Sequence, residues 1–457
     1  MLSQLIFLLV FAAAVFWFSR QIREVRGVIR LGRNEDRSGR PAERLTRMLL
    51  VAFGQQKMFK RVTPALLHAV VYVSFLVINL EVLEIVIDGL TGQHRIMGQY
   101  TGALYDVLMW VNEWLALLVI VACVALLWRR NVMKISRFSG IEMQESKGLV
   151  ARRNFSYLDA NIILVTEIVL MLALFAFNVA DISLHRLEGK ELPGVFPVSG
   201  PLAAAGIFGQ DAHALHLIEQ IGWWGHIVGI LLFLNYLPYS KHFHIIMAFP
   251  NVYFSRLEPA GKFSSLPVVR EEVKAAFDPA YTPQEIPDAP KRFGARDVTD
   301  LTWKNLLDSY TCTECGRCTA VCPANLTGKK LSPRKIVMDV RDRLEEIRKY
   351  KLAPDENGVL VPSNGVAGAE EAAKHTLLGE RYITEEELRA CTTCNACVEA
   401  CPVNIDQVSI ITELRRHLVM EDSAYPEAWT HLFNNIENTG NPWGMPAASR
   451  FDWAQEA

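Results

Sequence analysis

The stretch Cys312-Thr313-Glu314-Cys315-Gly316-Arg317-Cys318-Thr319-Ala320-Val321-Cys322-Pro323 carries its cysteines in the pattern C-x2-C-x2-C-x3-C-P. The same pattern recurs once, in a run that begins at Cys391 and ends at Cys401-Pro402. Together the two runs hold all but one of the nine cysteines of the chain. Spacing of this regularity indicates two metal-binding loops, and the surrounding fold is expected to form around them.

In each run the spacing resembles that of bacterial ferredoxins, whose thiolates bind [4Fe-4S] clusters. In two-cluster ferredoxins the fourth cysteine of each run binds the other cluster. The resemblance therefore implies crossed ligand sets, one of Cys312, Cys315, Cys318 and Cys401 and the other of Cys391, Cys394, Cys397 and Cys322. Zinc sites and disulfides are the alternatives. Closely spaced runs that end in Cys-Pro fit zinc poorly, and disulfides do not suit a cytoplasmic domain.

The composition changes sharply near residue 250. The chain has 457 residues, a length that allows two or three domains. The first half contains long apolar runs, whereas the second half is charged and interrupted by proline. A formal net charge of −2, without a basic arm or a nucleic-acid motif, predicts no nucleic-acid partner.

Five apolar segments have the length of membrane-spanning helices. They cover residues 2–18, 65–87, 105–128, 158–179 and 218–249. The first is short enough to be a signal peptide, but it has no basic n-region or A-x-A site, and arginines follow it instead of preceding it. We therefore expect a retained helix with its N-terminus outside.

Loop charge predicts the orientation of these helices. Residues 19–62 contain twelve Lys and Arg and residues 129–157 contain seven, whereas residues 89–102 contain one and residues 181–220 contain two. The positive-inside rule places the basic loops in the cytoplasm. The part after residue 250 is then cytoplasmic, and the expected location is a prokaryotic inner membrane.

Two histidines in the fifth apolar segment suggest haem ligation. His226 and His244 are five helical turns apart, so on one continuous helix they would share a face and lie about 27 Å apart. Pro238 lies between them and is expected to bend the helix at most. Axial histidines at two depths indicate b-type haem, with interfacial histidines that bind nothing as the alternative.

The second helix offers a partner for one of these ligands. His68 lies at the cytoplasmic end, so we pair it with His244, and we rank the neighbouring His242 second because it points to another side of a helix. For His226 no partner stands out. The loop histidines His94, His185, His213 and His216 are the remaining candidates. One haem b is therefore predicted, and a second is left open.

Glu81 and Glu84 lie in the outer part of the second apolar segment. Carboxylates inside a membrane are costly and usually face an interior or a water path. One interpretation is proton handling beside a quinone. The other is that the helix ends sooner and both side chains are interfacial. Cys123, outside the two runs, is expected to be a packing residue.

The stretch Pro238-Tyr239-Ser240-Lys241-His242-Phe243-His244, together with His68 and His226, resembles the cytochrome b family of the nitrate reductase gamma subunit and membrane heterodisulfide reductase. This resemblance implies a five-helix haem b bundle and a quinone substrate. The family has a further ligand ten residues after the position of His68, where this chain has Ile78.

The second half is similar to the iron–sulfur subunits of heterodisulfide reductase and of glycerol-3-phosphate and succinate dehydrogenases. This similarity rests on the cysteine runs and on the stretch from Phe293-Gly294-Ala295 to Trp303. Helical periodicity after Ser332 and a capping box at Thr384 predict helices between and beside the runs. The expected fold is all-α, with a transmembrane cytochrome b-type bundle at 1–249, a Pro-rich tether at 250–300 and a helical ferredoxin domain at 301–457.

Together these features predict a membrane electron-transfer subunit of a quinone-linked oxidoreductase. Electrons would pass between quinone, haem b, two clusters and a cytoplasmic partner, in a direction that the sequence leaves open. Because no cysteine follows Cys401, the catalytic site is expected in a partner, either a cysteine-rich subunit or a flavoprotein. The alternative is an anchor and conduit for a soluble enzyme, without a quinone site of its own.

Overall fold

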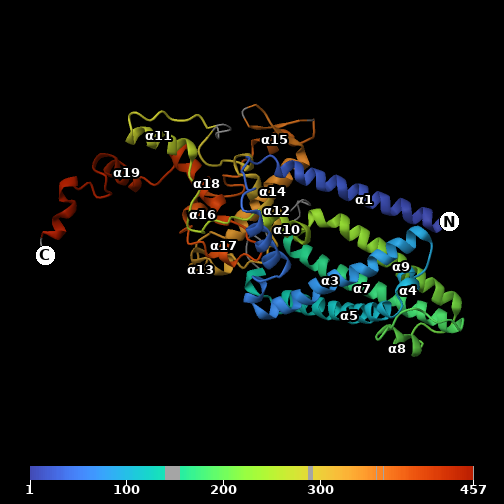
Figure 1. Ribbon diagram of the computed structural model, residues 1–457. Helices are drawn as coiled ribbons and strands as arrows, with labels where there is room; N and C mark the ends of the chain where they lie inside the picture. The colour runs from blue at the N-terminus through green and yellow to red at the C-terminus, as the bar shows by residue number, and fades with distance from the viewer. Residues whose placement is uncertain (139–154, 287–291, 357, 364, 456–457) are drawn as a thin grey trace.

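The computed structural model describes residues 1–138, 155–286, 292–356, 358–363 and 365–455. Figure 1 shows two parts, a bundle of long helices and a compact part built from shorter ones. In the described residues the one sheet is a pair of antiparallel strands, β1 (Leu352–Pro354) and β2 (Leu360–Pro362), with Leu352 opposite Pro362. The prediction of a helical protein is confirmed.

Five helices in the described residues are long and apolar enough to cross a membrane, as the sequence predicted. They are α1 (Leu2–Ile29), α3 (Val62–Thr91), α5 (Ala103–Asn131), α7 (Phe155–Leu187) and α9 (Ala212–Tyr236). Large apolar side chains such as Val121 and Leu172 are exposed on their outer faces. An apolar surface of this extent is typical of a membrane protein.

Small residues let the bundle helices approach closely. Within the bundle, α7 and α9 form the most extensive contact between two helices. A Cβ atom at Gly222 of α9 would lie 2.6 Å from the backbone nitrogen of Phe177 of α7, so only glycine fits there. This contact fixes the height of α9, and with it that of His226, against α7.

The remaining α-helices of the described residues are shorter. They are α2 (Pro41–Met48), α4 (Ile96–Thr101), α8 (Ser199–Ala204), α10 (His244–Tyr253), α11 (Pro267–Phe277), α12 (Trp303–Thr311), α13 (Pro323–Leu326), α14 (Pro333–Tyr350), α15 (Ala369–Lys374), α16 (Glu385–Arg389), α17 (Ala396–Ala400), α18 (Gln407–Met420) and α19 (Ala428–Thr439). Ser332 caps α14, and Thr384 and Glu387 form the predicted capping box of α16. Both helix predictions are confirmed.

The prediction of one continuous fifth helix across residues 218–249 is wrong. Helix α9 ends at Tyr236, two 3-10 turns follow at Leu237–Tyr239 and Lys241–Phe243, and α10 begins at His244. Proline lacks an N–H donor and clashes with the preceding turn, so Pro238 ends the α-helix instead of bending it. The distance and shared face inferred for His226 and His244 from a straight helix therefore do not apply.

Helix α1 is longer than the predicted segment and reaches into the second part. It continues through the arginines after residue 18 to Ile29. Val25 and Val28 near its end are buried in one hydrophobic core with Leu301 and Leu306 of the second part. Figure 1 shows α1 running from the free end of the bundle to this compact part. The two parts consequently share a core.

The segment expected to be a tether is partly packed against the rest of the chain. Arg44, which is buried, donates to the backbone oxygens of Tyr253 and Ser255. Ala295 is buried and its backbone N–H donates to Glu413 of α18. Residues 287–291 lie outside the described residues. Both ends of the segment are therefore fixed to folded structure.

A buried lysine, paired with an aspartate of its own helix, also joins the two parts by a hydrogen bond. Lys304 of α12 donates from Nζ to Asp308 at 2.6 Å and to Asn251 of α10 at 2.9 Å. Lys304 and Asp308 are both buried. Burial lowers the pKa of Lys304 and raises that of Asp308, and each charge counters the shift of the other.

We expect Lys304→Met to lower the free energy of unfolding by about 3–5 kcal/mol, because it leaves a buried carboxylate without its counterion. Chemical denaturation of the detergent-solubilised protein, followed by circular dichroism, measures the loss. The double variant Lys304→Met/Asp308→Leu should recover most of it. Lys374→Met, in an exposed pair with Glu371, is the matched control and should change stability little. Equal losses in both single variants would contradict the assignment.

Candidate metal and haem sites

The cysteines of the two runs come together in the crossed arrangement. Cys391, Cys394 and Cys397 line one small cavity, and the fourth cysteine on its wall is Cys322 of the first run. Pro323 lines the same cavity, directly after the crossing residue. The first and second runs are therefore interleaved in space.

The other four cysteines form a second group. Burial raises the pKa of the Cys401 thiol to about 12, and the neighbouring Cys315 and Cys312 contribute to the rise. Burial likewise raises the pKa of Cys318 well above its usual value, with contributions from Cys315, Cys312 and Cys401. Thiols in such surroundings stay protonated unless a bound metal supplies positive charge. The chemistry of this donor set fits a metal cluster.

The spacing of the sulfur atoms distinguishes a cluster from a single ion. Among the described residues, no three of the eight sulfurs lie within 4.8 Å of one another. The four sulfurs around one zinc ion, each at about 2.3 Å, would lie closer together than that. All nine cysteines are free thiols, so no disulfide forms. The arrangement of the sulfurs therefore fits a [4Fe-4S] cluster better than a single zinc ion.

Backbone N–H groups also point at the sulfurs. Thr393 donates to Sγ of Cys391 at 3.4 Å and Ile405 donates to Sγ of Cys401 at 3.3 Å. Thr393 has a positive φ of 54°, a left-handed conformation that turns the chain around the sulfur. Hydrogen bonds of this kind tune the reduction potential of a bound cluster.

The group that contains Cys315 faces the bundle. Glu314, beside it, accepts from Lys241 Nζ at 2.5 Å and also from Arg341. Burial opposes ionisation, but Lys241 and Arg341 together hold the pKa of Glu314 well below its usual range. Arg317 of the same run donates to the backbone oxygens of Lys57 and Met58, just before α3. These contacts of Glu314 and Arg317 could not be inferred from the sequence, because the residues that form them lie far apart in the chain.

The group that contains Cys394 is the more exposed of the two. Cys394 is exposed and Cys391 is half-buried, whereas in the other group only Cys315 is half-buried and the remaining three cysteines are buried. The second group therefore reaches the protein surface at Cys394.

His68 and His244 lie close together at the end of the bundle that joins the second part. Their ring centroids are 6.4 Å apart with an angle of 40° between the planes. Two metal–imidazole bonds of roughly 2 Å, plus about 1.1 Å from nitrogen to centroid on each side, give a separation of about 6.2 Å. Nδ1 of His244 donates to the backbone oxygen of Lys241 at 3.0 Å. Metal-ligating histidines fix their second nitrogen in this way.

His242 lies closer to this pair than the helical-wheel argument implied. Its ring centroid is 5.6 Å from that of His244, in an edge-on arrangement. The argument fails because these residues occupy a 3-10 turn and the start of α10, not one α-helix. Burial lowers the pKa of His242 to about 3 and also lowers that of His244.

His226 has one bonded and one unbonded nitrogen. Nδ1 donates to the backbone oxygen of Leu170 at 2.8 Å, while Nε2 is buried without a hydrogen-bond partner. A buried nitrogen without a hydrogen-bond partner is available to bind a metal. In the described residues, however, no other histidine ring contacts the ring of His226. Ile78 is buried in an apolar cluster with Leu170. The structure thus brings no second histidine to His226.

The loop histidines considered as partners lie elsewhere. His94 and His185 both contact Asp181, His216 contacts Glu219, and His213 is exposed. Asp181 lies four residues before His185 on α7, so helical spacing could have predicted the contact between these two side chains from the sequence.

Glu81 and Glu84 are buried within α3, which continues to Thr91. The interpretation that the helix ends sooner is therefore wrong. Asn112 donates to one oxygen of Glu81 at 3.1 Å, and the other oxygen has no hydrogen-bond partner. Tyr105 donates to Glu84 at 2.8 Å. A carboxyl oxygen that is buried and unbonded is available to a polar ligand.

Comparison with known proteins supports the iron–sulfur assignment. A family model described as a 4Fe-4S dicluster domain matches residues 311–405, which include all eight cysteines of the runs. The chain is similar to a probable iron-sulfur-binding oxidoreductase, FadF, of Bacillus subtilis, with 30% identity over 100% of this chain and 61% of the relative. It is also similar to an EtfAB:quinone oxidoreductase of Syntrophomonas wolfei, with 26% identity over 92% of this chain and 55% of the relative.

A third relative is a probable membrane-anchored ferredoxin of Chromohalobacter salexigens, 35% identical over 38% of this chain and 26% of its own length. Heterodisulfide reductase subunits C and D from Methanosarcina also match, so that part of the resemblance is confirmed. No solved structure matches. The chain spans about three fifths of the length of the first curated relatives. Its homologues are iron–sulfur oxidoreductases, and the chain carries a 4Fe-4S dicluster domain for electron transfer.

Paired substitutions test the crossed ligand sets. Cys322→Ala combined with Cys397→Ala removes two ligands of one predicted cluster, so iron should fall from about eight to about four atoms per chain. Cys322→Ala combined with Cys318→Ala removes ligands of both clusters and should lower iron further, with loss of both cluster signals in electron paramagnetic resonance spectra. Iron and sulfide analysis of anaerobically purified protein measures both. The reverse ranking would mean that each run binds its own cluster.

Proposed function

We propose that this protein is the membrane electron-transfer subunit of a quinone-linked oxidoreductase. In this proposal two [4Fe-4S] clusters and haem b connect a membrane quinone with a partner in the cytoplasm. When bound, these groups supply one-electron carriers. The chain holds them, sets the distances between them and excludes water from them. The substrate chemistry resides in the partner.

The observation that carries the proposal is the position of one short loop. Lys241 bonds through its side chain to Glu314, between Cys312 and Cys315, and through its backbone oxygen to His244. The same residue thus positions one end of the proposed haem site and one end of the proposed first cluster site. A membrane anchor alone does not need these two sites to share a buried contact.

The residues suggest the order of the proposed carriers. His68 and His244 lie at the inner end of the bundle, the Cys315 group faces them, and the exposed Cys394 belongs to the group beyond. We infer that Cys394 marks the surface where the cytoplasmic partner docks. The relative named EtfAB:quinone oxidoreductase supports a flavoprotein as that partner, and the heterodisulfide reductase relatives support a cysteine-rich subunit.

We place the quinone beside Glu81. Quinone chemistry couples electrons to protons, so a quinone site needs a group that accepts or supplies a proton. Glu81 has a free carboxyl oxygen inside the bundle, and Asn112 holds its other oxygen. The charge bias of the loops supports a cytoplasmic location for the cysteine runs and an outer location for the bundle end near Glu84.

A second candidate function is an anchor and conduit without a quinone site of its own. The observation that favours it is the polar network around Glu84, which contacts Tyr105 and the backbone of Met97 and has a purely structural explanation. Turnover with a quinone distinguishes the two functions.

The haem proposal predicts that His68→Ala and His244→Ala each remove about one haem b per chain, because each removes an axial ligand. A pyridine haemochrome assay on the purified chain measures this. His242→Ala is the matched control and should retain the haem, since His242 is the neighbour and not the partner of His68. Haem loss in the His242 variant alone, or wild-type protein without haem, would contradict the assignment. The same assay on His226→Ala tests for a second haem, because haem lost in this variant would be bound at His226.

The quinone proposal predicts that menaquinol reduces the bound cofactors, and that Glu81→Gln slows this reduction by about 100-fold or more. Stopped-flow absorbance measures the rate. Glu167→Gln is the control, since it changes a carboxyl group elsewhere in the bundle. Both variants should keep wild-type iron and haem content. Equal rates for Glu81→Gln and wild type would favour the second candidate function or another quinone position.

A further inference from the structure

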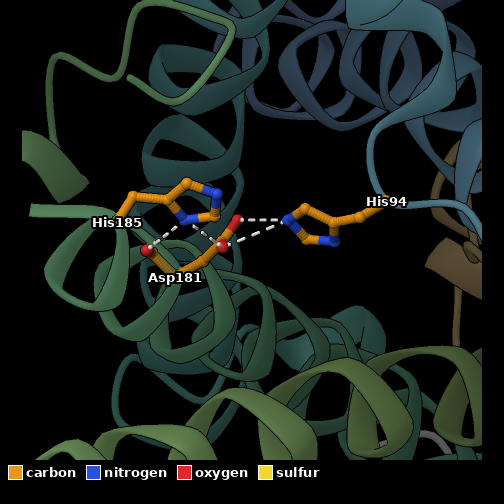
Figure 2. Close-up of side chains that lie close together, drawn as sticks. All are labelled: His94, Asp181 and His185. Carbon is orange, nitrogen blue, oxygen red and sulfur yellow. Dashed lines mark hydrogen bonds and ion pairs between the residues drawn. The ribbon is translucent and has the colours of Figure 1, made fainter. Parts of the chain in front are cut away.

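Three metal-ligand side chains meet at the end of the bundle remote from the cysteine runs. Figure 2 shows His94, Asp181 and His185 pointing toward one another. One ring nitrogen of each histidine and one carboxylate oxygen lie within 4.8 Å of one another. His94 comes from the turn between α3 and α4, and the other two come from α7. The described residues contain no other group of this kind.

We propose that His94, Asp181 and His185 bind a divalent transition-metal ion, of which Zn²⁺ is the best match. Bonds of about 2.0–2.1 Å in a tetrahedral site place neighbouring ligand atoms about 3.3 Å apart. Nε2 of His94 lies 3.1 Å from Oδ1 of Asp181, and Nδ1 of His185 lies 3.1 Å from the same oxygen. Each histidine nitrogen thus lies at nearly the required distance from the carboxylate oxygen, and all three ligand atoms lie within 4.8 Å of one another.

In the metal-free protein, protons occupy the place of the ion. Nε2 of His94 donates to both carboxylate oxygens of Asp181, and Nδ1 of His185 donates to the backbone oxygen of Asp181. An ion replaces these protons, so binding releases them and is weaker at low pH. Arg95 donates from Nε to the other oxygen, Oδ2 of Asp181, at 2.9 Å. This contact orients the carboxylate and leaves Oδ1 for the ion, as outer partners of metal ligands do.

The charge of the surroundings favours a cation. Arg95 contributes one positive charge, whereas the buried carboxyls around it are those of Glu81, Glu84, Asp88, Glu113 and Asp181. Arg95 contacts Asp181 directly, the backbone of Arg95 bonds to Asp88, and its guanidinium reaches Asn178, which bonds to Glu113. The Asp181 carboxylate lies in a region of low dielectric, where its attraction for a divalent ion is stronger than in water.

Ions have access to this group from water. The side chain of His94 is 44% exposed and that of His185 is 24% exposed, whereas that of Asp181 is 4% exposed. Two histidines at the rim and a buried carboxylate below make a site open on one side, which leaves a coordination position for water. A bound ion would link the turn after α3 to the end of α7 through its ligands.

The test is zinc binding to the full-length, detergent-solubilised protein purified anaerobically with its clusters intact. After dialysis against micromolar ZnCl₂, metal analysis should find about one zinc per chain, and X-ray absorption at the zinc edge should show nitrogen and oxygen ligands at about 2.0–2.1 Å. His94→Gln and the double variant His94→Gln/His185→Gln should lose this zinc. His216→Gln, an exposed histidine beside Glu219, should keep it.

Three outcomes would overturn the proposal. These are wild-type protein without bound zinc, a double variant that retains it, and a zinc spectrum dominated by sulfur at about 2.3 Å, which would place the ion in the cysteine sites. Unchanged iron content and a single gel-filtration peak confirm that the variants are folded. His94→Gln changes only a half-exposed side chain, so its result holds even if the double variant fails to fold. None of these readouts depends on quinone turnover.

Discussion

The buried carboxylate of Glu314 is the constraint on which the arrangement of the two parts depends. It lies between two cysteines of the first run and is held by Lys241 from the membrane part and by Arg341 from α14. A buried ion pair is costly to break, because the remaining charge has neither water nor a partner. The first cysteine loop therefore cannot move away from the loop that ends at His244. The proposed function, electron transfer between carriers held by these two loops, requires such a fixed distance.

The shared hydrophobic core supports the same geometry. Val25 and Val28 at the end of α1 pack with Leu301 and Leu306, so a helix that begins at the free end of the bundle ends inside the iron–sulfur part. The short turns around Pro238 bring Lys241 to Glu314 and let α10 begin at His244. The helix break thus determines how Lys241 and His244 are placed.

The two ends of the bundle differ in their chemistry. The end next to the iron–sulfur part has half-buried histidines, whose lone pairs suit a metal. The opposite end has buried carboxyls around Arg95, among them that of Glu81, which has one oxygen unbonded. The proposed metal-binding group of His94, Asp181 and His185 lies at the surface of this end. This separation supports the proposal that electrons are handled at one end and protons or cations at the other.

The sequence by itself determined the features that depend on local spacing. The eight cysteines, their crossed pairing by resemblance, the five apolar helices and the caps at Ser332 and Thr384 all follow from patterns within a few turns or loops. The pairing of His68 with His244 followed from their expected depth. Tertiary structure decided where α9 ends, how α1 joins the second core, which cysteine group faces the bundle, and that Arg95, Asp181 and Glu84 form one buried network. These depend on contacts between residues distant in the chain, whose partners no local pattern specifies.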